Sequence, residues 1–317
     1  MLRTAVVGTG YLGAFHAQKY SQLPASNLVG VVDVNATQGQ KVAGDCNTAY
    51  FDDHKALLDK VDAVSIAVPT SMHHAITRDF LEAGVHVLVE KPITSTVEEA
   101  KELVSLAREK QLVLQVGFLE RFNAALGNVA PQLNQPRFIE SHRLAGFKPR
   151  SMDINVVMDL MIHDLDIILS LVDSPVSDIA ANGTPVLTNS IDIAQARLTF
   201  SNGCVANITA SRISHKCKRK MHIFQETGCI CVDFQALKTR FFSKGDKEMF
   251  PGIPNIECQE QQYTDDDQLK KEIDDFLQCI ENKKVKHVTQ HTLNSKDHIN
   301  RLLKAEKIAF SSFDDKR

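Results

Sequence analysis

The sequence predicts two domains: an α/β domain with a doubly wound parallel sheet, followed by an α+β domain with a large, mainly antiparallel open sheet. Three observations lead to this prediction. The chain has 317 residues, more than one domain usually holds. Its first part alternates short Val/Ile-rich runs with segments of helical period. Later, β-prone stretches follow one another without long helices between them, which favours an antiparallel sheet. We therefore expect one domain over residues 1–120 and a second over residues 121–317.

The runs in the first domain fit strands, and the segments between them fit helices. Apolar residues recur every three or four positions in the helical segments, and one of these opens with the capping-box pattern Thr96-Val97-Glu98-Glu99. The predicted strands are Thr4–Val7, Leu28–Asp33, Ala63–Val68, His86–Glu90 and Val113–Val116, and the predicted helices are Tyr11–Gln22, Ser71–Ala83 and Thr96–Lys110. Right-handed crossovers between such units give a doubly wound sheet.

The second domain is predicted to contain one long apolar helix, Ile154–Leu171, followed by β-prone stretches and two closing amphipathic helices. The stretches are Ala194–Phe200, Cys204–Ala210, Met221–Gln225 and Cys229–Phe234, with the turn Ser201-Asn202-Gly203 after the first, and the closing helices lie near Asp266–Glu281 and Leu293–Phe310. Met249–Thr264, with two prolines, is predicted to be a loop or an irregular strand. Because a large sheet without helices on its second face must be covered, we expect a homo-dimer or homo-tetramer.

Composition excludes several classes of protein. The 43% hydrophobic and 24% charged fractions are typical of soluble proteins, and no apolar run reaches the roughly 18 residues that span a bilayer, so no membrane partner is expected. The chain enters strand-like Leu2–Val7 without a secretory signal, and its seven cysteines are scattered, so we expect reduced thiols and a cytoplasmic location. Neither Cys229-Ile230-Cys231 nor His73-His74 has further ligands at metal spacing, so no metal is predicted.

The net charge of −3 argues against a nucleic-acid partner. One local cluster, His215–Lys220, is basic. It is interpreted either as a phosphate-binding group or as a solvated strand edge protected by lysines.

The turn Gly8-Thr9-Gly10-Tyr11-Leu12-Gly13 predicts a dinucleotide site. It follows a strand and opens a helix, and Asp33 ends the next strand 20 residues after Gly13, which is the context of a Rossmann fold. Gly8 allows the tight turn, Gly10 lets backbone N–H groups approach the pyrophosphate, and Gly13 lets the helix pack closely on the strand. Asp33 should accept hydrogen bonds from the ribose hydroxyls and repel a 2′-phosphate, so the predicted cofactor is NAD. A vestigial site, or a turn capped by Asp33, is the alternative.

Two further segments carry a resemblance to a known family. Together with the glycine turn, Glu90-Lys91-Pro92 after a strand and Asp159-Leu160-Met161-Ile162-His163 on the long helix resemble the Gfo/Idh/MocA oxidoreductases, over essentially the whole chain. Met161 stands where that family often has glycine, which changes helix packing rather than chemistry. The resemblance implies NAD-dependent oxidation of a sugar hydroxyl. The cofactor residues then expected are Gly8, Gly10, Tyr11, Leu12, Gly13, Asp33, Pro69, Thr70, His73, Glu90 and Lys91.

Four other segments narrow the resemblance to one branch of this family. They are residues 67–74, 117–123, 140–143 and 209–212. That branch oxidises the C3 hydroxyl of UDP-N-acetylglucosamine to a ketone and supplies an aminotransferase on the way to a 3-amino sugar for lipid A. Another sugar, nucleotide sugar or inositol is the alternative substrate, and a non-catalytic, NAD-binding regulatory protein is the alternative of another class.

Alcohol oxidation needs a base for the hydroxyl proton while hydride leaves the carbon. Lys91 follows the carboxyl end of a parallel strand, where ligands bind in such sheets. Asp159 and His163, four apart on a helix, share a face, and Asp166 lies near the same side, where it could hydrogen-bond His163 or the backbone. By resemblance, His163 is the principal acid/base, Asp159 binds the sugar hydroxyls and Lys91 acts on the same reacting hydroxyl. Which of Lys91 and His163 holds the proton stays open.

Three arginines are candidates for the substrate diphosphate, because a guanidinium fork matches phosphate oxygens. Each of them could equally form an ion pair on the protein surface. The substrate residues expected are Arg121, Asn123, Arg143, Asp159, His163 and Arg212.

Overall fold

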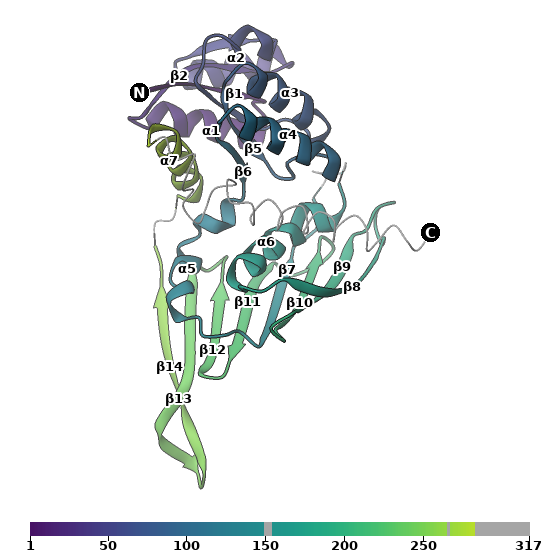
Figure 1. Ribbon diagram of the computed structural model, residues 1–317, viewed down its shortest axis with the longest axis vertical. Coiled ribbons are helices and arrows are strands. Elements are labelled where there is room, and N and C mark those ends of the chain that lie inside the picture. The colour runs from purple at the N-terminus through teal and green to yellow at the C-terminus, as the bar shows by residue number, and fades with distance from the viewer. Residues whose placement is uncertain (149–153, 265–266, 283–317) are drawn as a thin grey trace. The chain divides into compact units, whose positions relative to one another are not determined.

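The computed structural model describes residues 1–148, 154–264 and 267–282. The chain divides into two compact units (Figure 1). The first unit combines residues 1–119 with a helix that follows Asp267. The second unit begins at Glu120 and includes the strands and helices up to the end of the large sheet.

The first unit is built on a six-stranded parallel sheet of order β3-β2-β1-β4-β5-β6. Its strands are β1 (Leu2–Val7), β2 (Ser26–Val32), β3 (Ala49–Phe51), β4 (Ala63–Ile66), β5 (His86–Glu90) and β6 (Leu114–Gly117). Its helices are α1 (Tyr11–Gln22), α2 (Ala36–Asp45), the 3₁₀ turn η1 (His54–Leu57), α3 (Thr70–Glu82), α4 (Val97–Glu109) and α7 (Gln268–Glu281). The strand order reverses direction between β1 and β4, so right-handed crossovers place α1 and α2 on one face and α3 and α4 on the other.

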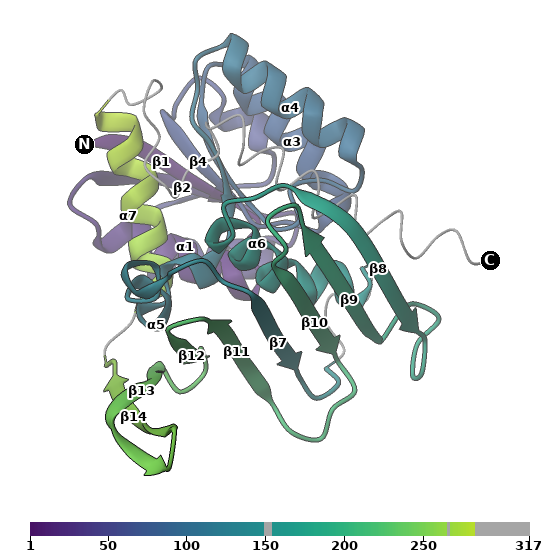
Figure 2. The ribbon, with the colours of Figure 1, turned by 60° about the horizontal axis from the view of Figure 1, so that its bottom comes forward.

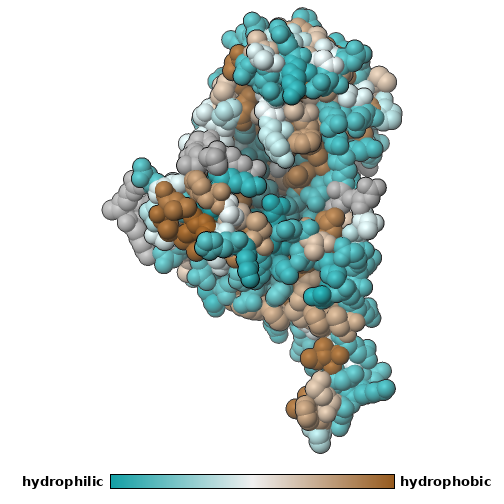
Figure 3. All heavy atoms as spheres, turned by 180° about the vertical axis from the view of Figure 1, so that it is seen from behind, coloured by the Kyte–Doolittle hydropathy of each residue, from teal (hydrophilic) through white to brown (hydrophobic). Residues whose placement is uncertain are grey.

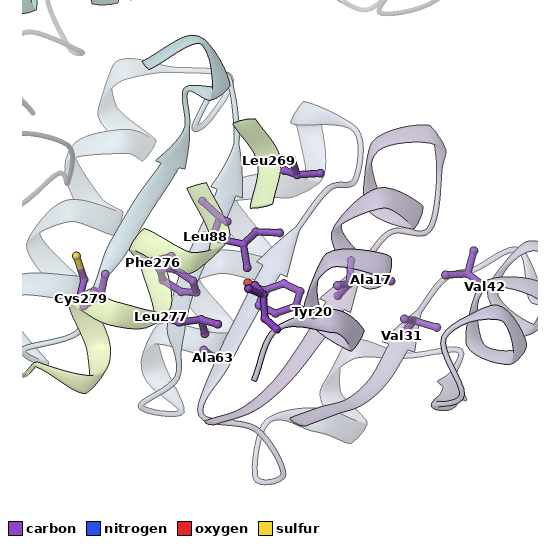
Figure 4. Close-up of a cluster of buried hydrophobic side chains, with 14 of the residues drawn as sticks. Ala17, Tyr20, Val31, Val42, Ala63, Leu88, Leu269, Phe276, Leu277 and Cys279 are labelled. Atoms are coloured by element: carbon purple, nitrogen blue, oxygen red, sulfur yellow. The ribbon is translucent and has the colours of Figure 1, made fainter. Parts of the chain in front are cut away.

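The helix α7 returns to the first unit from the far end of the sequence. Its apolar face, with Ile273 and Phe276 fully buried, joins Tyr20 of α1 and Leu88 of β5 in one core (Figure 4). The predicted second domain, residues 121–317, includes this helix. The structure packs it in the first because apolar side chains of α1 and of the sheet would otherwise be exposed on that side.

The predicted parallel sheet is confirmed, and the predicted helix α1 has the observed bounds. The capping box before α4 is also present: Glu99 N donates to Thr96 Oγ1 at 3.3 Å, and Thr96 N donates to Glu99 Oε2 at 3.1 Å. The prediction lacks α2 and β3. Five of the ten residues of α2 are glycine, threonine or glutamine, which weakens its apolar period.

The second unit is built on an eight-stranded sheet of order β14-β13-β12-β11-β7-β10-β9-β8 (Figure 2). All neighbouring pairs are antiparallel except β7 and β10. The strands are β7 (Phe138–Leu144), β8 (Val176–Thr184), β9 (Ile193–Phe200), β10 (Val205–Ser211), β11 (Lys218–Gln225), β12 (Gly228–Asp233), β13 (Lys238–Phe250) and β14 (Ile253–Gln262). Short turns η2 (Leu119–Phe122), α5 (Ala124–Gly127) and η3 (Ala130–Gln132) precede the sheet, and a π-helical turn η4 (Val157–Met161) leads into α6 (Ile162–Leu171), which packs against β7 and β10.

The mainly antiparallel open sheet is confirmed. The residues predicted as a loop or irregular strand include the whole of the edge strand β14, and its pairing with β13 has register shifts, so the irregular strand is the alternative that is confirmed. Pro254 is tolerated there because an edge strand has backbone groups that need no partner. The basic cluster begins β11, an inner strand between β7 and β12, so its interpretation as a strand edge is wrong. The predicted helix Leu293–Phe310 lies outside the described residues.

Candidate active site

The glycine turn between β1 and α1 has the geometry of a dinucleotide cradle. Gly8 has a φ of +89°, and a β-carbon there would lie 2.6 Å from the carbonyl oxygen of Ala67. A β-carbon on Gly13 would lie 1.8 Å from the carbonyl oxygen of Gly8. At Gly10, the N-cap of α1, an added β-carbon would meet no described atom within 4 Å. The open space in front of a helix N-terminus fits a pyrophosphate, so these residues fit NAD.

The two other cofactor residues predicted in this turn begin α1. Tyr11 is 79% exposed, and its ring contacts Phe15 edge-on at 5.2 Å between centroids. Leu12 is half-buried and packs against the core of the first unit. Leu12 therefore anchors the helix, while Tyr11 leaves its ring on the surface beside the turn.

Asp33, directly after β2, is held by the same turn. One carboxylate oxygen accepts hydrogen bonds from Thr9 N and Thr9 Oγ1, both at 2.7 Å, and the other accepts from Asn35 N at 2.8 Å. Burial would raise the pKa of Asp33, but the hydrogen bonds from Asn35 and Thr9 outweigh it and lower the pKa below its ordinary value. The site thus presents an ionised carboxylate, which disfavours a 2′-phosphate. The alternative role of Asp33, as the cap of a turn, is also seen in its hydrogen bond from Asn35 N.

The segment after β4 reaches α3 through Pro69, which is the N-cap residue, and Thr70, the first helical residue. His73, one turn later, is only 1% exposed. Its Nδ1 lies 2.8 Å from the carbonyl oxygen of Pro92, and its Nε2 lies 2.9 Å from that of Val68. Both ring nitrogens of His73 therefore face main-chain oxygens inside the first unit.

Glu90 ends β5, and Lys91 follows it, half-buried and joined to Pro92 by a cis peptide bond. The Oε1 atom of Glu90 lies 3.0 Å from Nε2 of His16, a residue of α1 that is 1% exposed. Sequence reasoning missed His16. Its signal was a polar residue on the buried stripe of α1, three positions after Gly13 and beside Ala17.

In the second unit, Asp159 lies in the π-helical turn η4 and His163 lies in the first turn of α6. Both are half-buried among apolar neighbours. The helical segment starts later than the predicted Ile154, because Asn155 Oδ1 accepts hydrogen bonds from Val157 N at 3.0 Å and Met158 N at 3.1 Å and so caps it. A single π-turn is frequent at functional sites, and the sequence gives no sign of it.

Two buried ion pairs hold α6, the helix that carries His163. Arg143 of β7 donates from Nε to Asp164 at 2.7 Å, and Arg121 pairs with Asp166. Burial would lower the pKa of Arg143, but Asp164 and Glu120 raise it above its ordinary value. Asp166 therefore serves as an ion-pair partner of Arg121.

A third buried arginine, Arg212, holds the loop between β8 and β9. Its Nε donates to Asp192 at 2.7 Å, and its other nitrogens donate to the carbonyl oxygen of Ile154 at 3.0 Å and to Ser190 Oγ at 2.6 Å. Asp192 also accepts backbone hydrogen bonds from Val186 and Thr188. Burial would raise the pKa of Asp192, but these hydrogen bonds lower it far below its ordinary value.

The predicted diphosphate ligands thus make strong contacts within the second unit. Arg121, Arg143 and Arg212 are at most 9% exposed, and each is paired with a buried aspartate. Asn123 is 1% exposed: its Nδ2 donates to the carbonyl oxygen of Phe234 at 3.1 Å, and its Oδ1 accepts from Ala125 N at 3.0 Å. All four side chains order the second unit.

Within the described ranges, no group of three or more His, Cys, Asp or Glu side chains is placed to hold a metal ion. No helix in the described part of the chain is long and apolar enough to cross a membrane. The basic cluster is partly neutralised, because Lys220 pairs with Asp233 at 2.9 Å and Arg219 with Glu120 at 3.5 Å.

Comparison with protein-family models gives two matches that together cover most of the chain. Residues 2–118 match the model described as "Oxidoreductase family, NAD-binding Rossmann fold". Residues 131–231 match the "GFO/IDH/MocA C-terminal domain".

Known proteins agree with these matches. UDP-N-acetylglucosamine 3-dehydrogenase of Acidithiobacillus ferrooxidans is 42% identical over 280 residues, or 88% of each chain. A solved structure of the enzyme of that name from the same organism superposes with a TM-score of 0.88, at 39% identity and 96% coverage of both chains. Levoglucosan dehydrogenase in complex with NADH and levoglucosan shares the fold, with a TM-score of 0.84 at 18% identity over 99% of this chain and 98% of that one. This chain belongs to the Gfo/Idh/MocA family of NAD-binding oxidoreductases.

Proposed function

We propose that this protein oxidises the C3 hydroxyl of UDP-N-acetylglucosamine to the 3-keto sugar with NAD. The observation that carries the proposal is the 42% identity, spread over 88% of both chains, with a dehydrogenase of that specificity. By contrast, scyllo-inositol 2-dehydrogenase of Bacillus subtilis is 29% identical over 67% of this chain. The ionised carboxylate of Asp33 supports NAD over NADP as the cofactor.

The chemistry is assigned to three residues that lie in the family motifs. When bound, NAD accepts the hydride that leaves C3 of the sugar. His163 is the principal acid/base for the hydroxyl proton, Lys91 acts on the same oxygen, and Asp159 binds neighbouring sugar hydroxyls. The hydroxyl proton passes to His163 Nε2 or to Lys91 Nζ. The half-buried settings of all three side chains support these roles.

The ion pairs of the buried arginines support a second role for these residues, in addition to the predicted contacts with the diphosphate: they position the elements around them. Arg121 and Arg143 fix two carboxylates on α6 close to His163. Each of these two guanidinium groups already donates from Nε and Nη2 to an aspartate. We therefore assign Arg121 and Arg143 first to the orientation of α6, and Arg212 first to the loop between β8 and β9.

A screen of UDP-sugars with NAD and NADP tests the substrate. NADH absorbance should grow with UDP-N-acetylglucosamine and NAD, and mass spectrometry after deuteride reduction should locate the carbonyl at C3. Turnover of myo-inositol or a free hexose, without turnover of the UDP-sugar, would move the protein to another branch of the family. Absence of turnover with every sugar, together with tight NAD binding, would favour a regulatory protein.

The proposed roles of Lys91 and His163 are tested by K91A and H163A. Each should lower turnover by about 10²-fold or more, as loss of an acid/base does, while the Kd for NAD changes no more than a few-fold. His74 supplies the control, because its side chain is partly exposed on α3, where its Nε2 lies 3.1 Å from Glu102 Oε2. Unchanged turnover in either variant would remove that residue from the mechanism.

We place the reaction in the cytoplasm, where its product would be consumed by an aminotransferase that makes a 3-amino sugar for lipid A. The chemistry of the product supports this order, since a ketone is what a transaminating enzyme converts to an amine. A coupled assay with an aminotransferase and an amino donor should pull the oxidation forward. No increase in NADH yield in that assay would argue against the coupling.

We also propose that the chain forms a homo-dimer or homo-tetramer through its second unit. While α6 covers one face of the large sheet, Phe224 on the other face is 38% exposed. Four exposed apolar side chains, Met249, Phe250, Ile253 and Ile256, gather around the end of the β13–β14 hairpin (Figure 3). Light scattering should give two or four times the 35.2 kDa chain mass, and a monomer at micromolar concentration would contradict the proposal.

A further inference from the structure

The two residues that flank Lys91 each contact a buried histidine. On one side, the Glu90 side chain meets His16 of α1. On the other side, the Pro92 carbonyl meets His73 of α3. We infer that His16 and His73 are positioning residues: they hold the residues before and after Lys91 and so keep Lys91 in the position that its proposed role requires. This inference rests on the proposed role of Lys91.

The contact with His16 is built into the interior of the first unit. His16 is 1% exposed and the Glu90 side chain is 13% exposed. A β-carbon on Gly117, at the end of β6, would lie 2.8 Å from Glu90 Oε1, so the absence of a side chain there makes room for the carboxylate. Three separate elements, α1, β5 and β6, therefore fix the direction in which Glu90 points.

The surroundings of the His16 ring indicate which of its nitrogens carries the hydrogen that faces Glu90. Within the described residues, its Nδ1 is buried without a hydrogen-bond partner, whereas its Nε2 lies 3.0 Å from Glu90 Oε1. A buried N–H without an acceptor is costly, so the ring hydrogen belongs on Nε2. His16 then donates to the carboxylate of Glu90, and charge-assisted hydrogen bonds of this kind are strong.

The contact with His73 joins two segments that follow neighbouring strands. Its Nδ1 faces the carbonyl oxygen of Pro92 at 2.8 Å, and its Nε2 faces that of Val68 at 2.9 Å. In either neutral tautomer the ring donates to one of these carbonyls, and when protonated it donates to both. The segment after Lys91 is thereby tied to the segment that leads into α3.

Holding Lys91 from both sides matters because proton transfer depends steeply on geometry. A misplacement of about 1 Å in a reacting group can cost about 10²-fold in rate. Both histidines are buried, so we expect them to act through Lys91 rather than by contact with the substrate. Loss of one tie should lower kcat and leave NAD binding largely in place.

Paired substitutions test each tie, because asparagine places an amide nitrogen near the Nδ1 position of histidine and glutamine places one near Nε2. H16Q keeps a donor to Glu90, whereas H16N loses it. H73N keeps a donor to Pro92, whereas H73Q keeps only the contact to Val68. We expect kcat to fall about 10- to 100-fold in H16N and H73Q, and H16Q and H73N to recover most of that loss. Within each pair, the Kd for NAD and the Tm should agree closely, with H74N as the surface control.

Equal kcat values within both pairs would overturn the inference, because then only the bulk of the side chain matters. A parallel fall in kcat and NAD affinity in the same variant would also overturn it, since that pattern indicates a general loss of structure. The two pairs address the two ties separately, so a variant of one histidine that fails to fold leaves the other pair decisive. Full turnover in K91A would instead overturn the proposed role of Lys91, whatever the histidine variants show.

Discussion

A β-carbon added to Gly13 would lie 1.8 Å from the carbonyl oxygen of Gly8, so the glycine turn and α1 can pack together only when residue 13 has no side chain. Backbone must move to admit even a methyl group there. We expect G13A to lose about 1–3 kcal/mol of unfolding free energy, as overpacked sites do, together with NAD binding. Urea denaturation and NAD titration measure the two effects.

Gly10 provides the matched comparison, because an added β-carbon would meet no described atom within 4 Å. G10A should keep its unfolding free energy within about 1 kcal/mol, the usual range for changes at an N-cap. Its Kd for NAD should still rise, since the methyl group occupies the space in front of the helix N-terminus. Unchanged NAD affinity in G10A would contradict our placement of the pyrophosphate.

Removing the carboxylate of Asp33 should change the choice of cofactor. In D33A the charge that repels a 2′-phosphate is gone, and so are the hydrogen bonds with Thr9 and Asn35. We expect the ratio of kcat/KM for NAD to that for NADP to fall at least about tenfold, which corresponds to about 1.4 kcal/mol. D45A, at an exposed site at the end of α2, is the control. A ratio that stays constant in D33A would show that another group selects the cofactor.

The ion pair between Arg143 and Asp164 should contribute far more to stability than one on the surface. Both side chains are at most 3% exposed, so R143A leaves a buried carboxylate without its partner, which costs about 3–5 kcal/mol. R3A removes the partner of Asp62 at an exposed site and should be nearly silent. Thermal unfolding of both variants checks this prediction, and an equal Tm for R143A and R3A would contradict it.

Stability should fall as the pH is lowered below about 6.5, the ordinary pKa of histidine. Burial lowers the pKa of His73, His86, His142 and His222, so the unfolded chain binds protons that the folded chain does not accept. A second loss should follow below about pH 4, because Asp33 and Asp62 have lowered pKa values and lose their hydrogen bonds on protonation.

His86 allows this pH dependence to be assigned. Its Nδ1 accepts a hydrogen bond from Val113 N at 2.9 Å, which a protonated ring cannot do. H86N replaces Nδ1 with a carbonyl oxygen that does not titrate, so the slope of Tm against pH between 6.5 and 5 should become smaller. A slope identical to that of the unaltered protein would show that the other histidines carry the effect.

The sequence alone determined the features that depend on neighbouring residues. The strand, the glycine turn, the helix α1 and the aspartate after β2 lie within the first 33 residues, and their backbone requirements are visible as residue types at fixed spacing. The capping box at Thr96 and Glu99 is equally local. Family resemblance added Lys91, Asp159 and His163 because each lies in a short motif.

Only the tertiary structure decided which distant residues act together. His16 and Glu90 are 74 residues apart, Arg121 and Asp166 are 45 apart, and α7 joins a core that is otherwise built before residue 120. Buried polar groups must find partners wherever the chain brings them, and apolar faces must be covered by whichever element returns. The same residue types occur on surfaces as often as in such contacts. Tertiary packing therefore decides which of these distant residues become partners. The sequence shows only how far apart the residues lie along the chain.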